Sequence, residues 1–134
     1  GAADMHIMLC SKSVELVDAA SKAFSAGEYH LTVCECGLEA LGVVEVMDAD
    51  LLILDLDTPG LDGLLIVAAV RELAPTLPIV AVSTKPQVDA RAVSHRGVSY
   101  VTLPPGSTRE IQCLLAGFTQ TERTRFQPDA ESTR

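Results

Sequence analysis

Residues 50–63 read D-L-L-I-L-D-L-D-T-P-G-L-D-G. In this stretch a continuous apolar run is followed at once by Asp55, and Pro59 and Gly60 lie just beyond it. A short apolar run bounded by turn residues is typical of a central strand in a parallel sheet, because such a strand is buried on both faces. We therefore expect a strand over residues 50–54 with a polar loop at its carboxyl end.

Strand and helix patterns alternate on both sides of this stretch. Short apolar or alternating runs predict four further strands, over residues 5–10, 29–35, 79–82 and 97–101. Apolar residues at helical spacing predict five helices, over residues 13–26, 37–47, 61–73, 86–96 and 107–118. Ser13 is the expected N-cap of the first helix and Gly27 its C-cap. This alternation indicates a single α/β domain, a doubly wound five-stranded parallel sheet with helices on both faces.

Length and charge narrow the classes of function. The chain has 134 residues, enough for one globular domain, and a formal net charge of −8. Nucleic acids and anionic membranes attract positive charge, so we expect this domain to bind neither. No apolar run reaches the roughly 18 residues that a membrane-spanning helix needs, and no signal segment is visible. Together with unpaired cysteines, this favours a cytoplasmic protein.

The two ends of the domain differ in composition. We place the folded domain at residues 5–118. Residues 119–134 are mostly polar, with Phe126 as the only large apolar residue. Such a segment buries too little surface to order itself alone, so we expect a disordered tail or linker, or an extension of the last helix by a turn or two.

The four cysteines are Cys10, Cys34, Cys36 and Cys113. Cys34 and Cys36 form a C-x-C pair, which in a strand places both side chains on the same face. One interpretation is half of a metal or redox site, but no C-x-x-C partner motif accompanies the pair. The interpretation we favour is two small buried hydrophobic residues, since free cysteine is among the most buried residue types.

Polar residues follow several of the predicted strands. In a doubly wound sheet the ligand site lies at the carboxyl ends of the strands, where the strand order reverses. The positions at those ends are Ser11, Lys12, Asp55, Asp57, Ser83, Thr84 and the segment around Leu103.

With these elements in place, the chain resembles the receiver domain of bacterial two-component response regulators over about residues 5–118. Three blocks carry the resemblance: D-L-D-T-P-G-L-D-G at residues 55–63, E-C-G-L-E-A-L at residues 35–41, and L-P-I-V-A-V-S at residues 77–83. The resemblance implies a flavodoxin-like fold with strand order 2-1-3-4-5 and places Asp55 at the phosphoacceptor position.

The same resemblance assigns roles to two further side chains. Ser83 matches the switch Ser/Thr of the family, and its hydroxyl is placed to hydrogen-bond a phosphoryl oxygen from the neighbouring strand end. Tyr100 matches the aromatic switch residue, although a lone aromatic side chain on an edge strand is equally well explained by packing.

The departures from the family pattern are as informative as the matches. The family has two acidic residues after the first strand, and here those positions hold Ser11 and Lys12. The family has a lysine before a proline after the last strand, and here T-L-P-P places Leu103 in the position of that lysine. Asp55 therefore keeps neither its usual acidic neighbours nor its usual cationic partner.

These departures predict weak or absent Mg²⁺ binding and hence no cofactor. Mg²⁺ prefers oxygen ligands that include carboxylates. An ammonium in their place is repulsive, since two like unit charges about 4 Å apart cost roughly 4 kcal/mol at an effective dielectric constant of 20. Asp57 is a candidate replacement ligand, or simply a solvated loop acid. As a hypothesis, Lys12 takes the place of the metal and pairs with Asp55; the alternative is that Lys12 points to solvent.

The function we favour is a degenerate receiver module that acts through protein–protein contacts, without the standard Mg²⁺-dependent phosphorylation. Its expected partners are a histidine kinase or an output domain. A homodimer through the face formed by residues 86–96, 97–101 and 107–118 is also possible. The alternative is a working receiver, phosphorylated on Asp55 with a non-standard metal site. We do not expect an enzyme, because no G-x-G-x-x-G loop or Ser-His-Asp arrangement is present.

Overall fold

The computed structural model describes residues 4–60, 62–85, 98–104 and 107–125. Within them five parallel strands form one sheet in the order β2-β1-β3-β4-β5. The strands are β1 (Met5–Cys10), β2 (Tyr29–Cys34), β3 (Leu51–Asp55), β4 (Ile79–Ser83) and β5 (Val98–Thr102). The helices are α1 (Val14–Ala23), α2 (Gly37–Val46), α3 (Gly63–Leu73) and α5 (Thr108–Arg125). The predicted α/β class, five parallel strands and strand order are confirmed.

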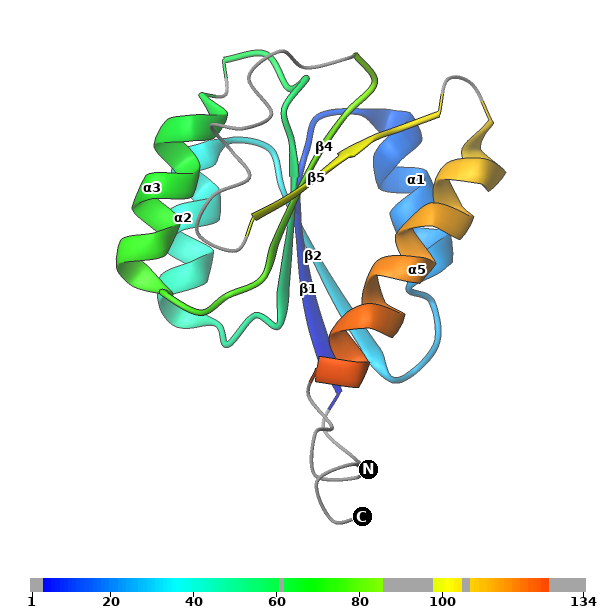
Figure 1. The fold of residues 1–134 in the computed structure, drawn as a ribbon, viewed down its shortest axis with the longest axis horizontal. Coiled ribbons are helices and arrows are strands. Elements are labelled where there is room, and N and C mark those ends of the chain that lie inside the picture. The colour runs from blue at the N-terminus through cyan, green and yellow to red at the C-terminus, as the bar shows by residue number, and fades with distance from the viewer. Residues whose placement is uncertain (1–3, 61, 86–97, 105–106, 126–134) are drawn as a thin grey trace.

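Helices cover both faces of the sheet (Figure 1). Helices α2 and α3 lie on one face, and α1 and α5 lie on the other. The described residues thus hold four of the five predicted helices, and the helix predicted over residues 86–96 lies outside them.

The central strand β3 separates the two halves of the core. All five of its residues are buried, as its continuous apolar pattern predicts. Leu52 and Leu54 pack with the cluster beneath α2 and α3, whereas Leu51 and Ile53 pack with the cluster beneath α1 and α5. Because side chains alternate along a strand, the residues of β3 contribute to both clusters. Asp55 is the last residue of β3 and lies at the carboxyl end of this central strand.

The turn after β3 explains the glycines of the quoted motif. Gly60 has a φ of 78°, a left-handed conformation that other residues adopt at a cost. A Cβ added at Gly63 would lie 2.5 Å from Cδ2 of Leu56, so the end of the Leu56 side chain would have to move to admit it. Asp62 is the N-cap of α3, and its side chain accepts a hydrogen bond from the backbone N–H of Leu65. Helix α3 therefore begins at Gly63, two residues later than predicted.

Other boundaries moved for similar local reasons. Ser13 caps α1 as predicted, but the C-cap is Phe24 and not Gly27. Phe24 is buried in the core, so the end of α1 is determined by packing, not by a glycine turn. Helix α5 continues to Arg125, so the first part of the predicted tail is helical, and residues 126–134 lie outside the described ranges.

The cysteines are free thiols with different surroundings. Cys10 and Cys34 are buried and lie opposite each other in the register of β1 and β2. Burial, together with nearby Cys34, raises the pKa of the Cys10 thiol to about 12. Cys36 is exposed, so the prediction that both members of the C-x-C pair are buried is wrong for Cys36. The physical reason is that β2 ends at Cys34 and Cys36 stands at the N-cap position of α2.

Candidate functional site

Asp55 is the last residue of β3, and only 4% of it is exposed. Its Oδ2 accepts a hydrogen bond of 2.6 Å from the Ser11 hydroxyl. Its Oδ1 accepts one of 2.9 Å from the backbone N–H of Asp57. None of the ion pairs within the described part of the chain includes Asp55. Two neutral donors, and no cation, therefore balance this buried carboxylate.

Ser11 follows β1 and is itself almost fully buried. Its hydroxyl donates to Asp55 and accepts from the backbone N–H of Ser13, which caps α1. The residue that replaces the first acid of the family thus links the start of α1 to the end of β3.

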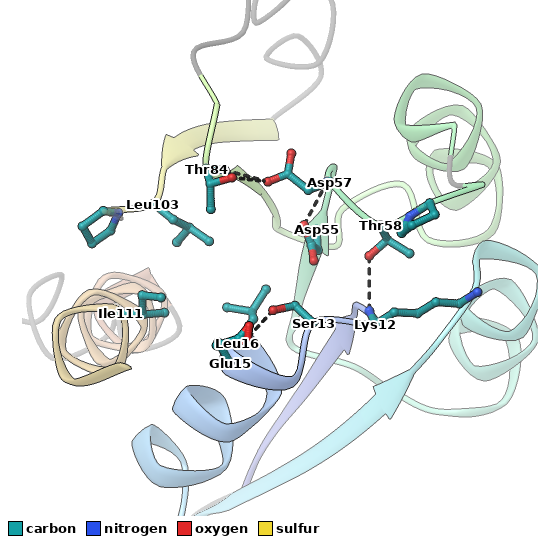
Figure 2. A pocket seen from close by; sticks show the side chains of 12 residues that line it. Lys12, Ser13, Glu15, Leu16, Asp55, Asp57, Thr58, Thr84, Leu103 and Ile111 are labelled. Carbon is teal, nitrogen blue, oxygen red and sulfur yellow. Dashed lines mark hydrogen bonds between the residues drawn. The ribbon is translucent and has the colours of Figure 1, made fainter. Parts of the chain in front are cut away.

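Lys12 does not lie beside Asp55. Its backbone N–H donates to the hydroxyl of Thr58 at 3.3 Å, and its exposed side chain extends away from Asp55 (Figure 2). The hypothesis of a Lys12–Asp55 ion pair is wrong for this structure, and the solvent-facing alternative describes it.

Asp57 turns towards the end of β4. Its Oδ1 accepts a 2.6 Å hydrogen bond from the Ser83 hydroxyl, and its Oδ2 accepts from both the backbone N–H and the hydroxyl of Thr84, each at 2.8 Å. Burial alone would raise the pKa of Asp57, but these hydrogen bonds and the charge of Lys85 outweigh it and lower the pKa. Asp57 is therefore a bound carboxylate, not the solvated loop acid that was the simpler expectation.

The contacts of Asp57 continue across the sheet to β5. The Ser83 hydroxyl also accepts a hydrogen bond from the backbone N–H of Lys85 at 3.0 Å. The Tyr100 hydroxyl in turn donates to the carbonyl of Lys85 at 3.0 Å, while its ring packs partly buried against the core. A chain of hydrogen bonds therefore connects Asp57, the loop after β4 and Tyr100.

Leu103 forms the opposite wall of the site. It is buried, with 4% exposed, and lines a cleft of about 620 Å³. Leu16 and Ile111 lie on the same side, while Asp55 and Asp57 lie across the cleft (Figure 2). The position that matches the family's lysine thus offers an apolar surface to the carboxylates.

The carboxylate oxygens of this site are engaged by donors of the same chain. Both oxygens of Asp55 and both oxygens of Asp57 already accept hydrogen bonds. Among the described residues no group of three or more His, Cys, Asp or Glu side chains is arranged to hold a metal ion. In that same part of the chain, no helix is long and apolar enough to cross a bilayer.

The structure gathers the predicted site residues at one edge of the sheet, but not in the predicted pairs. Sequence reasoning did not foresee that Thr84 binds Asp57 or that Thr58, only 5% exposed, binds the backbone of Lys12. Thr84 was already among the positions expected at the strand ends, and Thr58 directly follows Asp57, so for Thr58 that adjacency was the available signal.

The proposed dimer face is only partly described. Residues 86–96 lie outside the described ranges. On α5, Ile111 and Leu115 are buried in the core, with 6% and 0% exposed, so neither side chain is available on that face. Tyr100 and Leu114 are partly buried, so they are the described apolar candidates left on that face.

Comparison with known proteins gives a consistent result. The family model described as the response regulator receiver domain matches residues 7–112. The chain is 26% identical over 129 residues to the response regulator MprA of Mycobacterium avium, covering 96% of this chain and 56% of MprA. Among solved structures it is similar to the phosphorylated cyanobacterial phytochrome response regulator RcpA, with a TM-score of 0.80, 18% identity, and coverage of 92% and 96% of the two chains. It is also similar to HP1043, an orphan response regulator of H. pylori, with a TM-score of 0.72, 16% identity, and coverage of 88% and 95%.

A doubly wound sheet with a buried carboxylate at the tip of its central strand is the arrangement of a receiver-type signalling module. The chain belongs to the response regulator receiver family, whose model covers most of its length. At these low identities the solved structures show a shared fold. The chain spans 56% of the length of MprA, so the relative has a region with no counterpart here.

Proposed function

We propose that this chain is a receiver-type signalling module that acts through protein–protein contacts and does not carry out the standard Mg²⁺-dependent phosphorylation of Asp55. The observation that carries the proposal is the set of groups around Asp55. They are the hydroxyl of Ser11, a backbone N–H and, across the cleft, the apolar side chain of Leu103.

Electrostatics favours this reading. A phosphoryl group on Asp55 would add negative charge to a partly enclosed cleft that Glu15 and Asp57 also line. A charge in such a place needs a nearby cation or strong donors. Leu103 supplies neither, and the side chain of Lys12 points away. The phosphorylated state would therefore find no cation at the position of Leu103, and the nearby hydroxyl and N–H donors of Ser83 and Thr84 already bind Asp57.

The magnesium site is weakened by the same substitutions. Mg²⁺ requires near-octahedral oxygen ligation, usually with carboxylates beside the phosphate. Ser11 contributes a neutral oxygen that is already donating to Asp55 and accepting from Ser13. We therefore infer weak or absent Mg²⁺ binding, and no other cofactor.

The proposed partners follow from the family. Receiver modules of two-component systems bind a histidine kinase or an output domain. The match covers 56% of MprA, and the remaining length of that relative is consistent with an output domain as a partner. A homodimer through β5, α5 and residues 86–96 is a second possible contact. The net charge of −8 disfavours nucleic acid and membrane surfaces for this domain. We propose a cytoplasmic, non-enzymatic role.

A working receiver is the second candidate. It is favoured by Asp57, which lines the same cleft as Asp55 and is the candidate ligand of a non-standard metal site. The similar protein RcpA has been solved in a phosphorylated form. In this reading a histidine kinase would phosphorylate Asp55.

One experiment separates the two candidates. The chain is incubated with acetyl phosphate and Mg²⁺, and its intact mass is measured. We expect no added phosphoryl group on the natural sequence. The variant Ser11→Asp, Lys12→Asp, Leu103→Lys restores the family pattern and is expected to gain one. A phosphoryl group on the natural chain that disappears in Asp55→Ala would overturn the proposal.

A further inference from the structure

The last residue of β4 and the loop that follows it direct three hydrogen bonds at a single carboxylate. The hydroxyl of Ser83, the backbone N–H of Thr84 and the hydroxyl of Thr84 all donate to Asp57, over 2.6 to 2.8 Å. Ser83 is fully buried, so its hydroxyl is held in place by the surrounding core. The end of β4 and the loop after it therefore form an anion-binding site. The anion bound there is the carboxylate of Asp57, from the same chain.

The donors of Ser83 and Thr84 lie at the same end of the sheet as Asp55. Asp55 and Asp57 are two residues apart at the end of β3, which pairs with β4. The phosphoryl oxygens of a modified Asp55 and the carboxylate of Asp57 call for one kind of partner, hydroxyl and N–H donors. Because Asp57 already uses these donors, a phosphoryl group would have to displace it.

We propose that Asp57 is a positioning residue that substitutes for a phosphoryl group. Its carboxylate holds Ser83 and Thr84 and, through the carbonyl of Lys85, the hydroxyl of Tyr100. The loop after β4 and Tyr100 are thereby kept in one arrangement, whatever the state of Asp55. This inference rests on the proposed function, in which Asp55 carries no phosphoryl group.

The surroundings of Asp57 keep it charged and bound. Hydrogen bonds to an ionised acceptor are shorter and stronger than those between neutral groups, and the 2.6 Å contact with Ser83 fits that pattern. The nearby charge of Lys85 also favours the carboxylate form and contributes to its lowered pKa. Asp57 therefore remains an anion throughout the neutral pH range.

The test uses the full chain, labelled for NMR, with Asp57→Ala as the main variant. Removing the carboxylate should speed hydrogen exchange of the Thr84 amide about tenfold or more, because a charge-assisted hydrogen bond is lost. The ring signals of Tyr100 should shift as well. Asp48→Ala removes an exposed acid that makes no hydrogen bond or ion pair with the described residues, and it should leave both signals unchanged.

Inorganic phosphate, added at constant ionic strength, distinguishes a surrogate anion from a merely structural contact. In Asp57→Ala the vacated donors should bind the added phosphate, restoring the protection of Thr84 and the natural Tyr100 signals. Unchanged exchange in Asp57→Ala, or a change that phosphate fails to reverse, would overturn the proposal. Phosphorylation of the natural chain would contradict the proposed function instead, and the inference would survive if Tyr100 signals stayed fixed.

Discussion

Ser11 has a structural role that its position in the family pattern does not suggest. Its hydroxyl is one of the two hydrogen-bond donors to the buried Asp55. When one hydrogen-bond partner of a buried polar group is removed, the desolvation penalty of that group is no longer offset by the lost bond, and the folded state is destabilised. At this position the family has an acid and this chain has a small hydroxyl. The result is a hydrogen bond from a neutral hydroxyl to the Asp55 carboxylate, in place of two neighbouring acids.

Replacement of Ser11 by alanine should therefore destabilise the fold. We expect Ser11→Ala to lower the free energy of unfolding in urea by about 1–3 kcal/mol, because Asp55 loses a buried donor. Ser21→Ala is the control, since the Ser21 hydroxyl bonds an exposed backbone carbonyl of α1. The control should change stability by less than about 0.5 kcal/mol. Equal effects of the two substitutions would contradict this account of Ser11.

The thiols should differ in reactivity according to their burial. Cys36 and Cys113 are exposed, whereas Cys10 and Cys34 are buried. A thiol reagent reacts with the thiolate and needs access to it. We expect two thiols to react rapidly in the folded protein and the other two only after denaturation, as measured by absorbance of the released chromophore. Rapid reaction of all four thiols in the native state would be inconsistent with this core.

Single residues were predictable where local sequence determines their position. Asp55 follows a continuous apolar strand, so its place at the sheet edge could be inferred directly. The direction of the Lys12 side chain could not, because Lys12 lies in a loop held by a distant residue, Thr58, which accepts a hydrogen bond from its backbone N–H. The contacts of Asp57 depend on donors from β4, which lie 26 and 27 residues away in the sequence.

At the scale of elements, the start of α3 shows how a family motif becomes local structure. Asp62 caps the helix, and Gly63 allows the close approach of Leu56. We expect Asp62→Ala to cost about 1 kcal/mol of unfolding free energy, the usual loss for an N-cap, and Asp62→Asn to retain most of it. Urea denaturation measures both. A loss in Asp62→Asn as large as in Asp62→Ala would indicate that charge, not capping, is what matters there.

Strands were easier to predict than helix ends. The apolar runs of β3 and β4 mark their positions within one residue, since short apolar runs bounded by turn residues are typical of buried parallel strands. The end of α5 was not marked in this way. Thr119 is 1% exposed and its hydroxyl contacts that of Tyr29 at 3.2 Å, so tertiary contacts carry α5 beyond the predicted end at Phe118.

For the whole molecule, the buried Cys10 predicts a loss of stability in alkali. Its pKa is raised from 9.0 to about 12 in the folded protein. At pH values below 9.0 the Cys10 thiol is protonated in both the folded and the unfolded state. Its full contribution to the free energy of unfolding is therefore present there. As the pH rises from 9.0 towards about 12, only the unfolded thiol ionises, and the free energy of unfolding falls.

Urea denaturation on both sides of pH 9.0 tests this prediction. The decrease in unfolding free energy with rising pH should be smaller in Cys10→Ala than in the natural chain. Comparing slopes against pH removes the constant packing loss that the substitution itself causes. The same slope in both proteins would show that another group controls the alkaline transition.

The properties of the whole molecule depend on the electrostatics around Asp55, at the carboxyl ends of the strands. The fold and the location of the site could be predicted from sequence, because apolar runs and turn residues determine them. The pairing within the site could not, because it depends on which of several nearby donors reaches each carboxylate. Ser11 binds Asp55, whereas Ser83 and Thr84 bind Asp57. Neither pairing could be predicted from the sequence pattern.

Calorimetric titration of the full chain with Mg²⁺ tests the central claim most directly. With Ser11, Lys12 and Leu103 around Asp55, we predict no saturable binding in the millimolar range. The variant Ser11→Asp, Lys12→Asp, Leu103→Lys should show a saturable site under the same conditions. Saturable binding of Mg²⁺ to the natural chain, abolished by Asp55→Ala, would contradict the account.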